Sequence, residues 1–160
     1  MKKIEARSLA EYFGARLLAS KIKDREVRIA IVRLYGSLAK ANKEIGEEQE
    51  DIRKPLVEGH DEEIKKYAEL REKARNEKLD EKERKKATKE ADAMTECVRI
   101  EKDYLGAVDK LLNEECDADI KKVPLEVLYE ALSDCGFIGF ENELPISAVE
   151  IFFKPVISND

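Results

Sequence analysis

One apolar seam dominates the sequence and constrains what the first third of the chain can become. From residue 24 to residue 53, apolar side chains recur at alternating steps of four and three, with one gap at Glu48. This spacing places them along one side of an α helix about 45 Å long. A helix with a single apolar stripe is not stable alone in water, so the seam requires a packing partner. The seam residues are Val27, Ile31, Leu34, Leu38, Ala41, Ile45 and Ile52.

A second seam offers a partner of similar length. A shorter helix is predicted over about residues 61–77, and apolar residues then recur through 80–113 with one gap at Glu101. The register of these two segments does not match, which predicts a break near residues 76–80. Residues 24–53 and 80–113 are therefore expected to pair as an antiparallel, coiled-coil-like hairpin. The second seam comprises Ala87, Ala91, Met94, Val98, Leu105, Val108 and Leu112.

Local signals set the ends of the first segments. Asp24 stands at the N-cap position of the first long helix, where its carboxylate can accept backbone N–H groups. Pro55 is expected to stop that helix. Before it, Ile4 and Ala6 alternate with charged residues, which is typical of a short strand.

Two similar sequence segments lie near the C-terminus, "VPLEVLYEAL" at 123–132 and "LPISAVEIFF" at 144–153. Pro124 suits a first helical position, and Gly136 suits the residue that ends the helix. The alternation of apolar and polar residues in 117–123 predicts a short strand before the first of these two segments. Such short helices are stable only when docked, so their apolar residues are interpreted as a cap closing the base of the hairpin. These residues are Leu125, Leu128, Tyr129, Leu132, Ile146, Val149, Phe152, Phe153, Val156 and Ile157.

The fold class that follows is mostly α. We expect an elongated antiparallel helical hairpin with a small C-terminal α+β cap of short Pro-led helices. Residues 1–160 would form a single domain, in which 24–113 is the hairpin region and 1–23 and 114–160 form a globular base.

Charge is distributed unevenly. The net charge is −6, yet residues 1–42 carry +6 and the remainder carries −12. The simplest interpretation is a basic N-terminal part lying against an acidic C-terminal part. The alternative is phosphate contact by the basic N-terminal region, although the pI of 5.2 and the lack of interleaved aromatics weigh against nucleic acid. The candidate phosphate-binding residues are Lys21, Lys23, Arg25, Arg28 and Arg33.

The sequence offers little for catalysis or for cofactors. His60 is the only histidine, and the cysteines Cys97, Cys116 and Cys135 are spaced nineteen apart without a CxxC pair. No glycine-rich phosphate loop occurs. We therefore expect no enzyme activity, no cofactor and no metal site, and reduced cysteines in a cytoplasmic protein. No uncharged run exceeds six residues, so no membrane partner is expected.

The helix at 61–77 has an apolar stripe of its own, which is a candidate partner interface. The stripe consists of Ile64, Tyr67, Leu70 and Ala74. It folds back on the hairpin as a third helix, pairs with the same stripe of a second chain to form a homodimer, or binds a different protein.

The order of these features resembles a family of small uncharacterised proteins encoded by phages and prophages. The resemblance lies in "KKVPLEVLYEAL" and "ELPISAVEIFFKPVI", mainly residues 119–128 and 144–157, about a fifth of the chain. It implies an accessory or assembly role and carries over no catalytic residue. The predicted function is a non-enzymatic phage-type interaction or assembly protein acting through helix faces. The alternative is a nucleic-acid-associated accessory protein that uses the basic N-terminal region.

Overall fold

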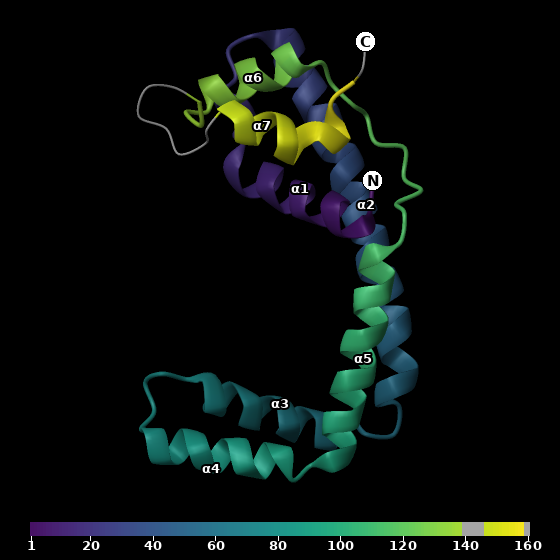
Figure 1. The fold of residues 1–160 in the computed structure, drawn as a ribbon, viewed down its shortest axis with the longest axis vertical. Helices are drawn as coiled ribbons and strands as arrows, with labels where there is room; N and C mark the ends of the chain where they lie inside the picture. Colours follow the sequence, from purple (N-terminus) through teal and green to yellow (C-terminus); the bar gives the residue numbers. More distant parts are fainter. Residues whose placement is uncertain (139–145, 159–160) are drawn as a thin grey trace. The chain divides into compact units, whose positions relative to one another are not determined.

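The computed structural model describes residues 1–138 and 146–158, and in these residues the fold is mostly α (Figure 1). Seven α helices and two short 3₁₀ helices, η1 and η2, are described, and no strand is among them. In chain order they are α1 (Lys3–Arg16), η1 (Ala19–Lys21), α2 (Arg25–Val57), α3 (Asp61–Arg75), α4 (Glu81–Asp92), α5 (Thr95–Asn113), α6 (Leu125–Asp134), α7 (Ile146–Phe153) and η2 (Lys154–Val156).

The chain divides into two compact units. Unit 1 comprises Met1–Gly46 and Leu112–Asp160, and unit 2 comprises Glu47–Leu111. The single-domain organisation and the pairing of 24–53 with 80–113 stay predictions.

Unit 1 is built around the first seam. The seam residues from Val27 to Ile45 are all buried, as predicted. Asp24 caps α2, because its Oδ1 accepts the N–H groups of Glu26 at 2.8 Å and Val27 at 2.9 Å. The main core of unit 1 joins the seam to α1, α6, α7 and η2 through Leu9, Phe13, Leu128, Leu132, Val149, Phe153 and Val156.

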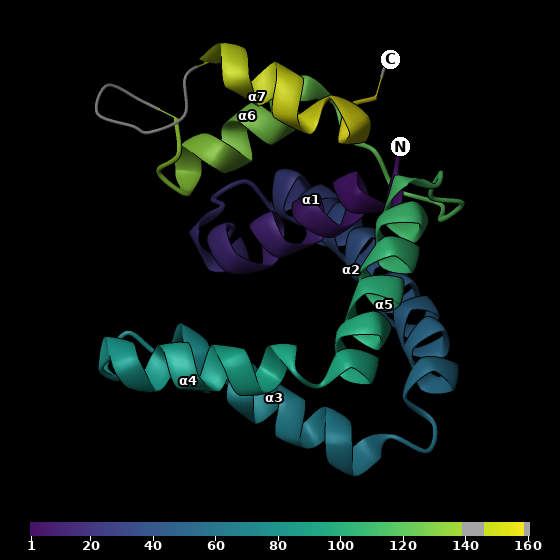
Figure 2. The same ribbon diagram turned by 60° about the horizontal axis from the view of Figure 1, so that its bottom comes forward.

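The Pro-led helices dock on this core, with α6 and α7 lying side by side (Figures 1 and 2). Pro124 occupies the N-cap of α6, one residue before the predicted position. Gly136 ends α6 at φ +83°, and the N–H of Phe137 donates to the carbonyl of Leu132 at 2.8 Å. With the Gly136 N–H on the Ser133 carbonyl at 3.0 Å, this is a Schellman motif. The predicted glycine stop is confirmed.

One of the predicted cap residues differs from the expectation. Phe152 is 41% exposed, whereas its neighbour Phe153 is completely buried. The prediction that Phe152 is a core residue is wrong, because α7 is short and turns only one of its two adjacent rings toward the core. Ile146 begins α7, and its side chain lies outside the described side chains.

The two predicted strands in unit 1 do not form in the described residues. Ile4 and Ala6 lie in α1, because the Glu5 carboxylate accepts the Lys2 N–H at 2.7 Å and starts the helix at Lys3. In 117–123 the Lys121 N–H donates to Ser37 Oγ at 3.0 Å instead of to a neighbouring strand. Only isolated bridges join Lys2 to Glu115 and Val123 to Ile157.

Unit 2 contains an antiparallel hairpin of α3 and α4, which lie side by side in both views (Figures 1 and 2). The predicted break at 76–80 separates them, and Asp80 caps α4 by accepting the Glu83 N–H at 2.8 Å. The hairpin buries Tyr67 and Leu70 of α3 together with Ala87 and Ala91 of α4 and Cys97 of α5.

Two helix boundaries in unit 2 differ from those predicted. α2 continues past Pro55 to Val57, because a proline in the last turn removes only one hydrogen bond, and the Glu58 N–H still donates to the Lys54 carbonyl at 3.1 Å. The segment 80–113 is two helices, since Met94 N–H donates to the Ala91 carbonyl in a tight turn at 3.0 Å. No glycine or proline marks that turn.

Candidate functional site

A groove in unit 2 is lined by residues of α2, α3 and α5. Its volume is about 500 Å³, within the usual range for ligand sites. On each helix the lining residues recur every three or four positions, so each helix gives one face to the groove. The lining residues are Arg53, Leu56 and Val57 of α2, Ile64, Tyr67, Ala68, Arg71, Glu72 and Arg75 of α3, and Cys97, Ile100, Glu101 and Tyr104 of α5.

A polar network crosses the apolar lining of this groove. The buried Tyr67 hydroxyl donates to Glu101 Oε2 at 2.5 Å and accepts from Arg71 Nε at 2.8 Å. The Arg71 guanidinium lies over the Tyr67 ring at 5.1 Å and pairs with Asp92 at 3.2 Å. Each side chain of this network therefore holds the others in place. The network forms one ordered polar patch in the otherwise apolar lining of the groove.

The environment sets the protonation of these groups. Burial, and then the hydrogen bond to Glu101, raises the pKa of Tyr67, so its hydroxyl remains a donor at neutral pH. The hydrogen bond to Tyr67 raises the pKa of Arg71. Burial, helped by the carboxylates of Glu63 and Glu96, raises the pKa of the Cys97 thiol. Cys97 is therefore a neutral apolar side chain in this groove rather than a nucleophile.

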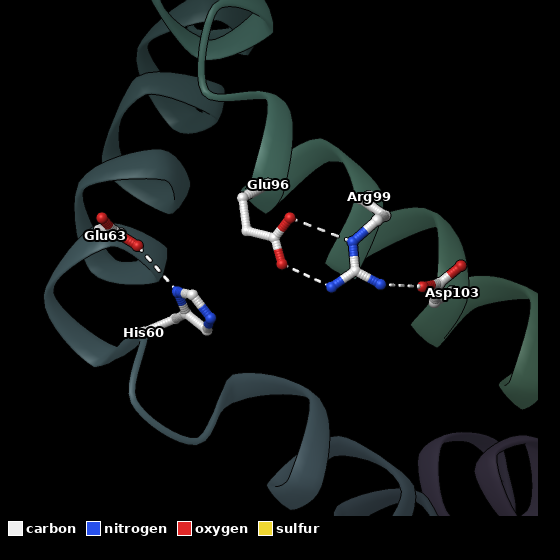
Figure 3. Close-up of polar contacts among 5 residues, drawn as sticks. All are labelled: His60, Glu63, Glu96, Arg99 and Asp103. Carbon is white, nitrogen blue, oxygen red and sulfur yellow. Dashed lines mark hydrogen bonds and ion pairs between the residues drawn. The ribbon is translucent and has the colours of Figure 1, made fainter.

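The single histidine lies in a separate polar cluster of unit 2 (Figure 3). His60 Nδ1 is 2.9 Å from Glu63 Oε2, within hydrogen-bonding distance. Arg99 binds Glu96 through Nε at 3.1 Å and Nη2 at 2.5 Å, and Asp103 through Nη1 at 3.1 Å. Arg99 lowers the pKa of Glu96, as expected for a paired carboxylate. Among the described residues, no group of histidine, cysteine and carboxylate side chains is arranged to hold a metal ion.

The predicted partner stripe of 61–77 is largely covered within the chain. Tyr67 and Leu70 are buried against α4 and Cys97, and Ile64 and Ala74 are partly buried beside them. Ile64 and Tyr67 also line the groove, whereas Leu70 and Ala74 do not. The stripe thus contributes to the groove from one edge, and the role of its four residues as an interface stays a prediction.

The structure separates the five predicted phosphate-binding residues into two groups. Lys23 pairs with Asp134 at 3.0 Å, and Arg28 donates to the Ile22 carbonyl from Nε at 3.0 Å and from Nη2 at 2.7 Å. These two side chains stabilise the turn between η1 and α2. Lys21, Arg25 and Arg33 are exposed.

Sequence reasoning missed the groove, although one signal for it was visible. Glu101 interrupts the second seam, and a charged residue in an apolar stripe indicates a buried polar partner, here Tyr67. The contribution of Leu56 and Val57 could not be foreseen, because it depends on α2 continuing past Pro55.

Comparisons with known proteins give no relative for this chain: no family model, no curated protein and no solved structure matches it. Within the described residues, no helix is both long enough and apolar enough to cross a bilayer.

Proposed function

We propose that this protein is a non-enzymatic interaction protein that receives the apolar face of a partner helix in the groove of unit 2. The observation that carries the proposal is that three helices line the groove mainly with apolar side chains. The groove chemistry agrees with binding rather than catalysis, because Tyr67, Arg71 and Glu101 satisfy one another and Cys97 is held neutral.

The dimensions of the groove favour a helix as occupant. The lining positions on α3 run from Ile64 to Arg75, about 16 Å or three helical turns. A partner helix of that length presents apolar anchors at positions i, i+4 and i+7, which is the usual mode of helix-in-groove recognition. Arg75 is exposed at one end of this row, so a carboxylate on the partner helix would complement it.

Photo-crosslinking in the natural host tests this function. A photo-reactive residue at the position of Glu72, which lines the groove, should capture one defined polypeptide. The same residue at Lys73, an exposed position on the other side of α3, should not. Filling the groove with Ala68→Trp should abolish capture from position 72. Equal capture at both positions, or capture that survives Ala68→Trp, contradicts the proposal.

The proposal also includes the elongated, coiled-coil-like hairpin that the sequence predicts. A phage-type assembly role, suggested by the resemblance of 119–128 and 144–157, would use an elongated, coiled-coil-like hairpin in a cytoplasmic protein. The buried seam of α2 supports a packed helix face.

Nucleic-acid association is the second candidate, favoured by the exposure of Lys21, Arg25 and Arg33. It ranks lower because Lys23 and Arg28 are engaged within the chain. Retention on a DNA column that falls with salt, and that is lost in Arg25→Glu, Arg33→Glu, would promote it.

A further inference from the structure

Unit 1 exposes apolar side chains on two separate surfaces that the proposed groove does not use. The first, the α2 outer face, consists of Arg25, Ile29, Val32 and Arg33, which lie opposite the buried seam at helical spacing. Ile29 is 39% exposed and Val32 is 51% exposed. Two exposed β-branched aliphatic side chains thus lie between two arginines on one helix.

The α2 outer face is positively charged. Within residues 1–138 and 146–158, Arg25 and Arg33 form no ion pair. They are eight residues apart, about 12 Å along the helix axis. Between Arg25 and Lys43, α2 carries five cations and one carboxylate, Glu26.

The second surface, the α1–α7 face, consists of Ile4, Glu5 and Glu11 of α1 with Ile151 and Phe152 of α7. Ile151 is 77% exposed, and Ile4 is 44% exposed. With Glu5 and others these apolar side chains line a shallow groove of about 350 Å³. Glu11 lies three residues after Ser8, another lining residue, and therefore on the same side of α1.

The two faces match in both respects that matter for docking. Each presents aliphatic surface, and one adds arginines where the other adds glutamates. Glu5 and Glu11 are about 9 Å apart along α1, close to the spacing of the two arginines and within the reach of their flexible side chains. An aliphatic stripe bordered by cations thus meets an apolar groove bordered by carboxylates.

We propose that the α2 outer face of one molecule docks on the α1–α7 face of a second copy of this chain. The contact is heterologous, since the two faces share no residue, and each added molecule leaves one face of each kind free. The protein therefore associates head to tail into rings or linear assemblies. The interface is small and partly electrostatic, so association is weak and is weakened further by salt.

Sedimentation velocity of two complementary variants tests the proposal. Val32→Asp blocks only the α2 outer face, and Ile151→Asp blocks only the α1–α7 face; both side chains are exposed, so the fold should persist. The wild type should associate as its concentration rises toward about 1 mM. Each variant alone should remain monomeric, with association weakened at least about tenfold. Mixed together, the variants should form a one-to-one dimer and nothing larger, because each retains one intact face.

Charge variants and a matched control make the result independent of the apolar substitutions. Arg25→Glu, Arg33→Glu should lose self-association, because both of its faces then carry carboxylates. It should associate again when mixed with Glu11→Lys, whose unchanged arginines match its unchanged α1–α7 face. Leu105→Asp, at a 58% exposed leucine of unit 2, should associate like the wild type. A monomeric wild type at about 1 mM, a blocked variant that still associates, or folded variants that stay monomeric when mixed would each overturn the proposal. DNA binding that depends on Arg25 and Arg33 in a wild type that does not self-associate would also overturn it, by assigning this face to nucleic acid.

Discussion

The Tyr67 hydroxyl donates a hydrogen bond to Glu101 Oε2 at 2.5 Å, joining α3 to α5 across the lining of the unit 2 groove. Arg71, one turn further along α3, donates to the same hydroxyl at 2.8 Å. The hydroxyl is therefore both a donor and an acceptor, and it orders one carboxylate and one guanidinium. One atom thus links two of the helices that line the groove.

Removing the Tyr67 hydroxyl should destabilise the protein measurably. Tyr67→Phe leaves Glu101 and Arg71 each without one partner, while Arg71 keeps its ion pair with Asp92. We expect a loss of about 1–2 kcal/mol in the free energy of unfolding, measured by urea denaturation. The matched control is Tyr104→Phe, in the same groove, whose hydroxyl bonds no described residue. An equal loss in both variants would contradict the role given to the Tyr67 hydroxyl.

The same tyrosine should make stability depend on alkaline pH. The raised pKa of Tyr67 in the folded state means that its stabilisation is complete below the ordinary value of 10.0. As pH rises past that value, the Tyr67 hydroxyl loses its proton in the unfolded state before it does so in the folded state. The stabilisation therefore declines until pH exceeds the pKa of the folded state. The difference in unfolding free energy between the wild type and Tyr67→Phe should therefore shrink between about pH 10 and about pH 11. A difference that stays constant or grows over this range would be inconsistent with a raised pKa.

The parts of the fold that could be predicted are those determined by residues close together in the sequence. The seam from Val27 to Ile45, the Asp24 cap and the Gly136 stop each follow from a few neighbouring residues, and the structure has all three. The break at 76–80 followed from a mismatch of register, which is also a local pattern.

The parts that could not be predicted depend on packing between distant segments. The turn at Ala93 and Met94 has no glycine or proline, and it forms where α4 lies along α3 and buries Ala87 and Ala91. The groove requires α2, α3 and α5 to meet. In the sequence, only the charged residue Glu101 within the apolar seam indicated it. For the same reason the sequence could not tell Phe153, in the core, from Phe152 at the surface.

This pair of adjacent phenylalanines gives a direct test of the unit 1 core. Phe153 is completely buried and packs edge-to-face on Phe13, with ring centroids 5.6 Å apart. Phe153→Ala should cost about 3–5 kcal/mol of unfolding free energy in thermal or urea denaturation. Phe152→Ala removes the same atoms from a 41% exposed position and should cost clearly less. Similar costs would place both rings in the core and contradict the described packing.

Gly136 should tolerate a side chain less well than a glycine inside a helix. Its φ of +83° lies in the left-handed region, while the space around it is open, so Gly136→Ala is strained only through its backbone. We expect a loss of about 1 kcal/mol. Gly46→Ala, within α2 and equally open, should instead stabilise by about 0.5–1 kcal/mol. Melting temperatures that shift in the same direction for both variants would disprove the left-handed C-terminal conformation.

The last prediction concerns acid stability where Lys23, which follows η1, contacts Asp134 of α6. The Lys23 backbone N–H donates to Asp134 Oδ2 at 2.8 Å, and the Lys23 ammonium lies 3.0 Å from Oδ1. These interactions lower the pKa of Asp134, the backbone hydrogen bond most strongly. A lowered folded pKa contributes stability that is complete above the ordinary value of 3.8 and is lost as pH falls through the folded value. Asp134→Asn keeps an acceptor for the N–H but has no charge to lose, so its melting temperature should fall less steeply below about pH 4 than that of the wild type. Asp117→Asn, an equal neutralisation at an exposed position, serves as the control. If Asp134→Asn follows the acid profile of the wild type, the Lys23–Asp134 contact does not stabilise the folded state.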